Sequence, residues 1–273
     1  MPPIEDLILF ALALAGAGVV AGILAGLFGI GGGAILVPVF YQVFAMVGVD
    51  EAVRMHLSVG TSLAIIVPTS LRSYFSHRKR GAVDDVLLKS WITAVPLGAL
   101  LAAVVAAYSS SEALRGIFAV IAVLVAFRML FNRASWRLGD DLPRNPFKYI
   151  AGVVIGLLSG LMGIGGGVLN NTFMSLYGRP MHQAVATSSG VGVLISIPGL
   201  IGYVIAGWGA SGLPPFSTGY INWVAVALII PITLLVAPVG VALAHRASKR
   251  QLEIGFGIFL LIVAVRFAIS LAE

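Results

Sequence analysis

The stretch GILAGLFGIGGG at residues 22–33 recurs, with few changes, as GLLSGLMGIGGG at residues 156–167. Each copy interrupts a long apolar segment with a run of glycines. Within a membrane, irregular backbone is tolerated only where it is buried in protein or lines a cavity. A pair of glycine-broken apolar segments in corresponding places is typical of transporters built from two internal repeats. The pattern therefore predicts a solute pathway at the two glycine runs.

The composition indicates a surface that largely faces lipid. Of the 273 residues, 59% are hydrophobic and 10% are charged, and the mean hydropathy is +1.03. An ordinary soluble protein carries roughly 25% charged residues, so soluble enzyme classes are excluded. The chain has no cysteine, which excludes disulfides, thiol nucleophiles and thiolate metal sites. We expect a membrane protein without enzymatic activity, cofactor or metal.

The apolar segments predict an all-α polytopic fold. A membrane-spanning helix needs about 20 mostly apolar residues. Two shorter apolar pieces, 34–47 and 168–177, follow the glycine runs and are expected to form half-helices or re-entrant segments. Eight long segments meet or nearly meet the required length: 7–29, 57–75, 86–107, 113–131, 147–164, 183–206, 220–243 and 252–271.

The net charge of +6 does not indicate nucleic-acid binding here. The positions of the basic residues instead predict how the chain is oriented in the membrane. Lys and Arg concentrate in cytoplasmic loops of membrane proteins, and here they concentrate at 76–80, 132–148 and 245–251. If these loops lie inside, both termini lie outside. Arg54 is then the single exception to the rule, because it lies outside. The second broken segment, together with the short helix after it, does not cross the membrane. The two halves of the chain are then inverted relative to each other.

The internal repeat extends beyond the glycines. The glycine runs are related by an offset of 134 residues, and the motif Met-His-x-x-Val-x-Thr-Ser at 55–62 recurs at 181–188 with an offset of 126. Further on, Pro96 corresponds to Pro238 and Arg128 to Arg266. We expect a single membrane domain over residues 1–273, with repeat one at 1–131, a cytoplasmic loop at 132–146 and repeat two at 147–273.

These motifs resemble the TauE/SafE (sulfite exporter) permease family. A GxxGxGGG-type break, a later Thr-Ser pair and a Pro-x-Gly occur twice, so the resemblance covers essentially the whole chain. The motif is not specific for one substrate. The resemblance implies a permease of the bacterial inner membrane for sulfite, sulfonates such as sulfoacetate or taurine, and related small anions. It also implies that the breaks and the Thr-Ser pairs are the family's signature positions.

The glycine runs are the first candidate binding residues. A helix that resumes after a break offers unpaired backbone N–H groups and the positive end of its dipole, which suit an oxyanion. The alternative is that glycine only allows close helix packing. The candidates are Gly31, Gly32, Gly33, Gly165, Gly166 and Gly167.

Hydroxyl and amide side chains near the breaks are the second set. They can donate hydrogen bonds to the oxygens of a sulfonate, although Ser and Thr in membrane helices often bond to their own backbone instead. This set comprises Thr61, Ser62, Asn170, Asn171, Thr187 and Ser188.

Three basic residues are candidates for gating or for attracting an anion. His56 and His182 occupy matching places in the two halves, so we expect one near each membrane face, where a histidine can titrate near neutral pH. Arg72 lies within the apolar run 57–75. For all three, the alternative is an interfacial position without a role in transport, such as an arginine that snorkels to the headgroups.

The carboxylates all lie at termini, in loops or at span ends. Proton relays within membranes usually need a buried carboxylate, and a buried carboxylate would repel an anion. The carboxylate positions therefore favour an anion pathway. Together with the family resemblance, which implies sulfur-containing anions, we expect alternating-access export of such an anion, with an anion channel or a uniporter for other small carboxylates and oxyanions as the alternative. The expected partners are the solute and membrane lipid, and small-residue surfaces are compatible with a homodimer.

Overall fold

The computed structural model describes residues 12, 14–24, 33–131, 137–244, 246 and 248–271. Within these residues the chain is helical, apart from one hairpin of two-residue strands, β1 (Ser217–Thr218) and β2 (Ile221–Asn222). A helical segment Leu14–Leu24 comes first. It is followed by α2 (Gly33–Met46), α3 (Glu51–Lys79), α4 (Asp85–Ser90), α5 (Ala94–Tyr108), α6 (Ser111–Leu130), α7 (Phe147–Met162), α8 (Gly167–Leu176), α9 (Met181–Ala206), α10 (Trp223–Ala244) and α11 (Lys249–Ile269).

Five of the described helices are long and apolar enough to cross a membrane, namely α3, α6, α9, α10 and α11. Four shorter apolar helices accompany them: the segment Leu14–Leu24, α2, α5 and α7. The prediction of an all-α membrane protein is confirmed at this level. Only residues 12 and 14–24 of the expected span 7–29 are described.

The predicted span 86–107 is wrong as a continuous helix. The chain forms the short helix α4, turns at residues 91–93, and continues as α5. The backbone N–H groups of Val95 and Leu97 bond to Trp91 O and Thr93 O, but Pro96 between them has no N–H to offer. Because a proline ring also collides with the carbonyl four residues earlier, Pro96 is accommodated in the first turn of a new helix and not inside an older one.

The two expected half-helices are present as α2 and α8, with 14 and 10 residues. At 1.5 Å per residue they reach about 21 and 15 Å, whereas the hydrocarbon core is about 30 Å thick. Neither can cross the membrane alone. The glycine run before α2 lies outside the described residues except for Gly33, so Gly31 and Gly32 have no described structure.

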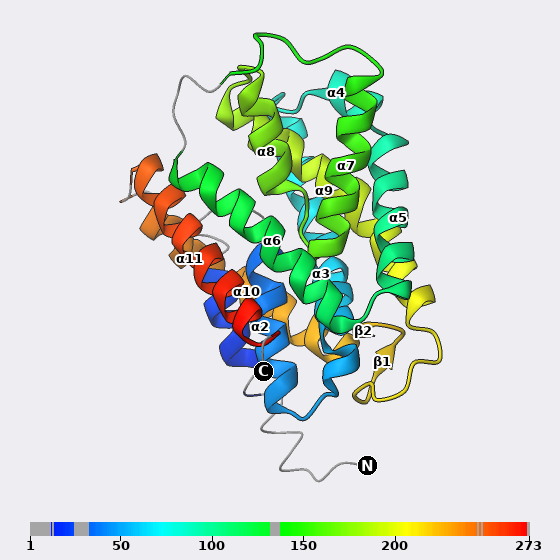
Figure 1. Cartoon of the computed structure of the whole chain (residues 1–273). Helices are drawn as coiled ribbons and strands as arrows, with labels where there is room; N and C mark the ends of the chain where they lie inside the picture. Colours follow the sequence, from blue (N-terminus) through cyan, green and yellow to red (C-terminus); the bar gives the residue numbers. More distant parts are fainter. Residues whose placement is uncertain are drawn as a thin grey trace.

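The long helices α3 and α9 lie together at the centre of the bundle and run in opposite directions (Figure 1). One end of the molecule holds the start of α3, the α5–α6 connection and the β-hairpin, and the other holds α4 and the start of α7 (Figure 1). The expected external loops 109–112 and 207–219 lie at the first end, which we call the hairpin end. The predicted cytoplasmic loop 76–80 and the described part of the second, 137–148, lie toward the other end, which we call the α4 end.

Glycine allows α5 and α7 to pack with their backbones in contact. A Cβ added to Gly98 would overlap Val153 O, and one added to Gly156 would overlap Val95 O. Close approach of this kind is how small residues hold membrane helices together. Gly98, the glycine of the first Pro-x-Gly motif, therefore has a packing role.

Candidate functional site

The second glycine break is a turn that only glycine accommodates easily. Gly163 ends α7 with φ +64°, and its N–H bonds to Gly160 O and Ser159 O. Gly166 precedes α8 with φ +72°. Both residues are in the left-handed region, where a Cβ is unfavourable. The chain thus reverses direction between α7 and α8, as the prediction of no net crossing requires.

Gly33, the one described residue of the first glycine run, meets the second break. A Cβ added to Gly33, at the start of α2, would lie 2.8 Å from Ile164 Cα and 2.9 Å from Gly163 O. Ser62 of α3 donates a hydrogen bond of 2.8 Å to the same Gly163 O. The predicted residues Gly33 and Ser62 are therefore brought together with the second break, although Ser62 and Gly163 are 101 residues apart in the chain.

This meeting point lies halfway along the two central helices. Gly165 and Gly166 are in contact with Ile66 near the middle of α3 and with Val191 and Ile195 near the middle of α9. Because α3 and α9 are long enough to span a membrane, their middles fall near the bilayer midplane. Broken helices at that depth are the usual location of a solute site in repeat transporters.

The polar groups around the second break are not all satisfied by the protein. No side chain caps the N-terminus of α8. The hydroxyls of Ser159 and Ser196 are fully buried and make no hydrogen bond, and the same is true of Asn170 Oδ1. Buried polar groups almost always have a partner, so each of these atoms is available to a solute, an ion or water. We call them the central site.

Asn170, Asn171 and Ser188 form one hydrogen-bonded chain. Asn170 Nδ2 donates to Ser188 Oγ over 2.7 Å, and Ser188 Oγ donates to Asn171 Oδ1 over 2.7 Å. Asn170 Nδ2 also contacts Met174 Sδ at 3.4 Å. The chain ties α8 to α9, and it consumes the hydroxyl proton of Ser188 that the sequence assigned to the solute.

Thr61 and Thr187 make matching contacts in the two halves. Thr61 Oγ1 accepts a hydrogen bond of 3.1 Å from the backbone N–H of Asn222, and Thr187 Oγ1 accepts one of 2.9 Å from that of Asp84. Asn222 and Asp84 in turn each accept a bond from a backbone N–H three residues later, Ala225 and Leu87. Thr61 therefore anchors the capped start of α10, and Thr187 anchors the capped start of α4.

The two predicted histidines lie in different environments. His56 is 3% exposed, its Nε2 bonds to Ala106 O and Ser109 O, and its ring packs on Tyr220. Burial raises the pKa of the Tyr220 hydroxyl. The expectation of an accessible histidine at a pathway mouth does not fit His56, which fixes the α5–α6 turn to α3. His182 at the start of α9 and Arg72 on α3 are exposed.

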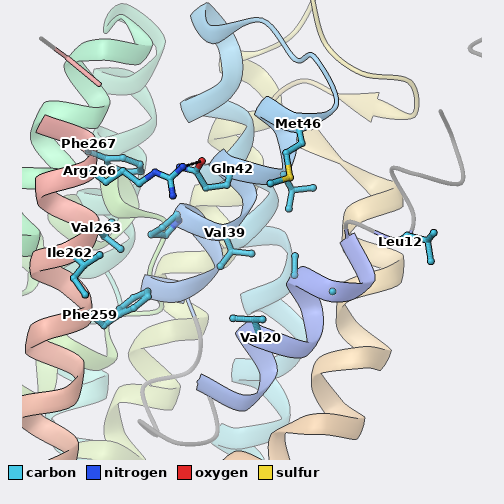
Figure 2. Close-up of a pocket in the computed structure, with 14 residues that line it drawn as sticks. Leu12, Val20, Val39, Gln42, Met46, Phe259, Ile262, Val263, Arg266 and Phe267 are labelled. Atoms are coloured by element: carbon cyan, nitrogen blue, oxygen red, sulfur yellow. Dashed lines mark hydrogen bonds between the residues drawn. The ribbon is translucent and has the colours of Figure 1, made fainter. Parts of the chain in front are cut away.

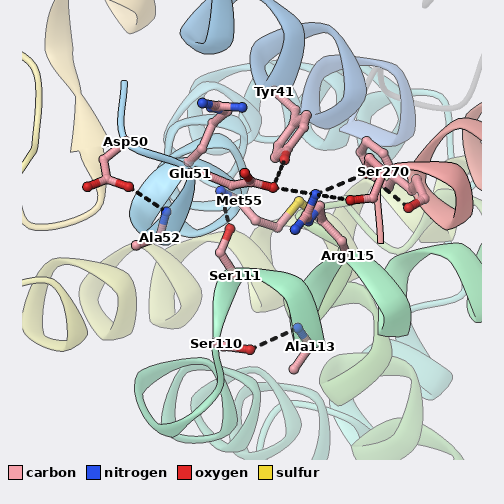
Figure 3. Close-up of polar contacts among 12 residues, drawn as sticks. Tyr41, Asp50, Glu51, Ala52, Met55, Ser110, Ser111, Ala113, Arg115 and Ser270 are labelled. Atoms are coloured by element: carbon pink, nitrogen blue, oxygen red, sulfur yellow. Dashed lines mark hydrogen bonds and ion pairs between the residues drawn. The ribbon is translucent and has the colours of Figure 1, made fainter. Parts of the chain in front are cut away.

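An ion pair between a buried arginine and a half-exposed glutamate lies at the hairpin end, and no sequence argument predicted it. Arg115, on α6, is 1% exposed and lies 2.6 Å from Glu51 at the start of α3. Its Nη1 also donates to the backbone and hydroxyl oxygens of Ser270, just after α11. The guanidinium groups of Arg54 and Arg115 both lie over the ring of Tyr41, on α2. Figure 3 shows how Arg115 joins α3, α6 and the end of α11.

The α4 end instead holds an open, charged pocket of about 570 Å³. Asp84, Asp85 and Asp141 line it together with Lys148 and Arg179. Arg179 Nη2 lies 3.7 Å from Asp141 Oδ1, and both side chains reach solvent. Because Asp84 also bonds to Thr187, this pocket adjoins the Thr-Ser pair of the second half.

Two of the residues that were not predicted could have been found from the sequence pattern. Ser70 and Ser196 are separated by the same 126 positions as Thr61 and Thr187, and a Cβ on Gly192 would lie 2.5 Å from Ser70 Oγ. An arginine only one turn into an apolar span, as Arg115 is, needs a partner. Nothing in the sequence alone distinguishes Ser159 from a packing residue.

Taken together, these elements define an all-α, multi-pass membrane protein with paired half-helices at its centre. A family model described as "Sulfite exporter TauE/SafE" matches residues 14–267. The chain belongs to this family, as its motifs predicted.

Relatives with transporter names match nearly the whole chain. A "Probable membrane transporter protein" of Haemophilus influenzae is 31% identical and covers 91% of this chain and 94% of its own. A protein of the same description from Methanocaldococcus jannaschii is 30% identical over 87% of each chain. One from Bacillus subtilis is 24% identical, over 90% of this chain and 93% of its own. No solved structure matches.

Proposed function

We propose that this protein exports small sulfur-containing anions, sulfite or organosulfonates such as sulfoacetate or taurine, across the bacterial inner membrane by alternating access. The observation that carries the proposal is the central site. There Gly33 meets the second break about halfway along α3 and α9, and the buried Ser159 and Ser196 hydroxyls are without partners. Hydroxyl groups and a helix N-terminus are donors, and an oxyanion is an acceptor.

The proposed inverted repeats, divided at residues 132–146, have support from paired contacts. Thr61 and Thr187 bond to corresponding helix starts. Arg115 near the start of α6 bonds to Ser270 O at the end of α11, and Arg250 at the start of α11 bonds to Met129 O at the end of α6. Contacts of this kind in both directions are what a two-fold axis in the membrane plane would produce.

The predicted site residues divide into two groups under this proposal. Ser62 and Ser188 hold the scaffold, because their hydroxyl protons are already donated to Gly163 O and Asn171 Oδ1. The two threonines hold it as acceptors of backbone N–H groups. The groups proposed to meet the solute are the N–H groups at the start of α8, at Gly167 and the two residues after it, and the hydroxyls of Ser159 and Ser196. Asn170 Oδ1 is an acceptor and suits the ammonium group of a zwitterion.

The test is binding and transport by the purified protein. Calorimetry in detergent should give binding of sulfite and sulfoacetate, weaker binding of taurine, and none of a cation of similar size. Ser196→Ala and Ser159→Ala should each weaken anion binding by about 1–2 kcal/mol, the value of a charge-assisted hydrogen bond. Ser175→Ala is the control, because Ser175 Oγ bonds locally to Thr172 O. Unchanged binding in both variants would remove the central site from the proposal.

The alternative function is an anion channel or a uniporter for other small carboxylates and oxyanions. A channel needs a continuous pore, whereas alternating access needs a barrier on one side, and we propose the Arg115–Glu51 contact at the hairpin end as that barrier. In liposomes, a transporter gives saturable flux with no unitary current. Single-channel current with sulfite as the main anion would favour the channel. Tighter binding of acetate or sulfate than of sulfite or sulfoacetate would change the substrate class.

A further inference from the structure

A groove of about 450 Å³ runs along the outside of the bundle, away from the central site. The helical segment Leu14–Leu24, α2 and α11 form its walls (Figure 2). Apolar side chains cover almost all of it, and several of them are exposed. In a helical membrane protein such a surface faces the acyl chains of the bilayer.

One end of the groove carries a single polar pair. Arg266 Nη2 of α11 donates a hydrogen bond of 2.7 Å to Gln42 Oε1 of α2. Figure 2 places this pair beside Met46, whereas Val20 and Phe259 lie at the opposite end. The described residues that line the groove include no carboxylate. Arg266 is exposed, so its charge is available to a ligand.

We propose that this groove is a binding site for a glycerophospholipid with a net anionic headgroup. The phosphate bonds to Arg266, and one acyl chain lies along Val20, Val39 and Phe259 toward the middle of the membrane. A guanidinium matches phosphate oxygens in a bidentate manner. An ammonium on the headgroup would find no carboxylate in the groove, and Gln42 Oε1 already accepts from Arg266. The site therefore selects a phospholipid whose headgroup carries no ammonium.

The position of the site agrees with the orientation of the chain. Arg266 lies four residues before Ser270, whose oxygens bond to Arg115 at the hairpin end. That end is predicted to face outside, so the phosphate belongs to the outer leaflet of the membrane. The proposal depends on membrane insertion alone and not on which solute the protein carries.

The chain offers a variant that fills the groove without disturbing the fold. A Cβ added to Gly16 meets no atom within 4 Å, so Gly16→Leu places its side chain in the groove. Leucine also has a higher helix propensity than glycine. Arg266→Gln removes the charge and keeps hydrogen-bonding capacity, and Lys89→Gln removes one exposed charge from α4, remote from the groove.

The experiment is native mass spectrometry of the detergent-purified protein, titrated with phosphatidylglycerol, phosphatidylcholine with the same acyl chains, and glycerol phosphate. Wild type and Lys89→Gln should bind phosphatidylglycerol most tightly. Arg266→Gln should lose about tenfold in that affinity, as expected for one charge-assisted contact. Gly16→Leu should weaken both lipids, because it blocks the acyl chain.

Three results would overturn the proposal. Equal binding of the two lipids by wild type would show that the charge does not select. Competition by glycerol phosphate at the lipid's own concentration would identify the ligand as a free anion. A dimer in wild type that Gly16→Leu converts to a monomer would mean that a second copy of the chain occupies the groove.

Discussion

The two ends of the bundle are held together very differently. At the hairpin end, Arg115 is 1% exposed and lies 2.6 Å from Glu51. At the α4 end, Arg179 and Asp141 are 3.7 Å apart, with side chains 34% and 91% exposed, beside an open pocket. The central site lies between the two ends. Under the proposed alternating access, we take the hairpin end as the closed side and the α4 end as the accessible side.

This comparison also separates what the repeats share from what they do not. The Thr61 and Thr187 contacts, deep in the bundle, are nearly the same in both halves. The histidines at the starts of α3 and α9 differ, because His56 is buried against Ala106 and Ser109 while His182 is exposed. We infer that the threonine contacts keep the repeat and that the histidine positions do not.

The largest effect should come from testing which end faces outside. The chain contains no cysteine, so a single introduced cysteine reports its own position. Tyr108→Cys at the hairpin end, where Tyr108 is 90% exposed, should react completely with an impermeant thiol reagent in intact cells. Arg137→Cys at the α4 end should react only after the membrane is opened. Strong labelling of Arg137→Cys in intact cells would contradict the inverted-repeat model.

The next largest effect should come from the ion pair. Glu51→Gln leaves the buried Arg115 cation without its counter-charge. Because Glu51 is half-exposed, we expect a cost of about 1–3 kcal/mol, between the values for exposed and for buried pairs. Arg115→Met removes the buried charge itself and leaves Glu51, which is 53% exposed, so its cost should be smaller. Thermal unfolding in detergent should rank the variants in that order.

The same variants also test whether the pair is a gate. Ser111→Cys lies at the buried start of α6, next to Met55. It should react slowly with an impermeant reagent in an otherwise unchanged chain and faster when combined with Glu51→Gln. The same slow rate in both would show that the pair stabilises the bundle without closing a path.

Features of the fold that depend on neighbouring residues could be predicted from the sequence, whereas contacts between residues far apart in the chain could not. The half-helices at Gly33 and Gly167 follow from local glycine chemistry and from apolar length, and both were predicted within one residue. Arg115 requires knowing that the start of α3 and the end of α11 lie beside α6, which is a tertiary fact. Likewise, the hydroxyls of Ser62 and Ser188 were assigned to the solute because their protein partners, Gly163 and Asn171, could not be seen.

A smaller effect should distinguish the two halves at their matched threonines. Thr→Val removes the acceptor for a backbone N–H and preserves shape, so an N–H that stays buried loses its partner at a cost of about 1–3 kcal/mol. Thr61→Val should lie toward the upper part of this range, because Asn222 is fully buried. Thr187→Val should cost less, since Asp84 is half-buried and water can replace the threonine. If Thr61→Val and Thr187→Val lower the free energy of unfolding equally, water reaches the backbone N–H at the α4 end no better than at the hairpin end.

The smallest effect should come from the exposed pair at the α4 end. Asp141→Asn removes the partner of Arg179, but exposed ion pairs contribute only about 0–1 kcal/mol. We expect a change in unfolding free energy of less than about 0.5 kcal/mol, and a still smaller one at high salt because exposed charges are screened.

Anion entry should respond differently to the same variant, because Asp141→Asn removes one negative charge from the pocket that holds Lys148 and Arg179. Under the proposed function, the concentration of sulfite that half-saturates transport from the α4 side should fall, and that from the hairpin side should not. An equal change from both sides would show that this pocket is not the mouth of the open end.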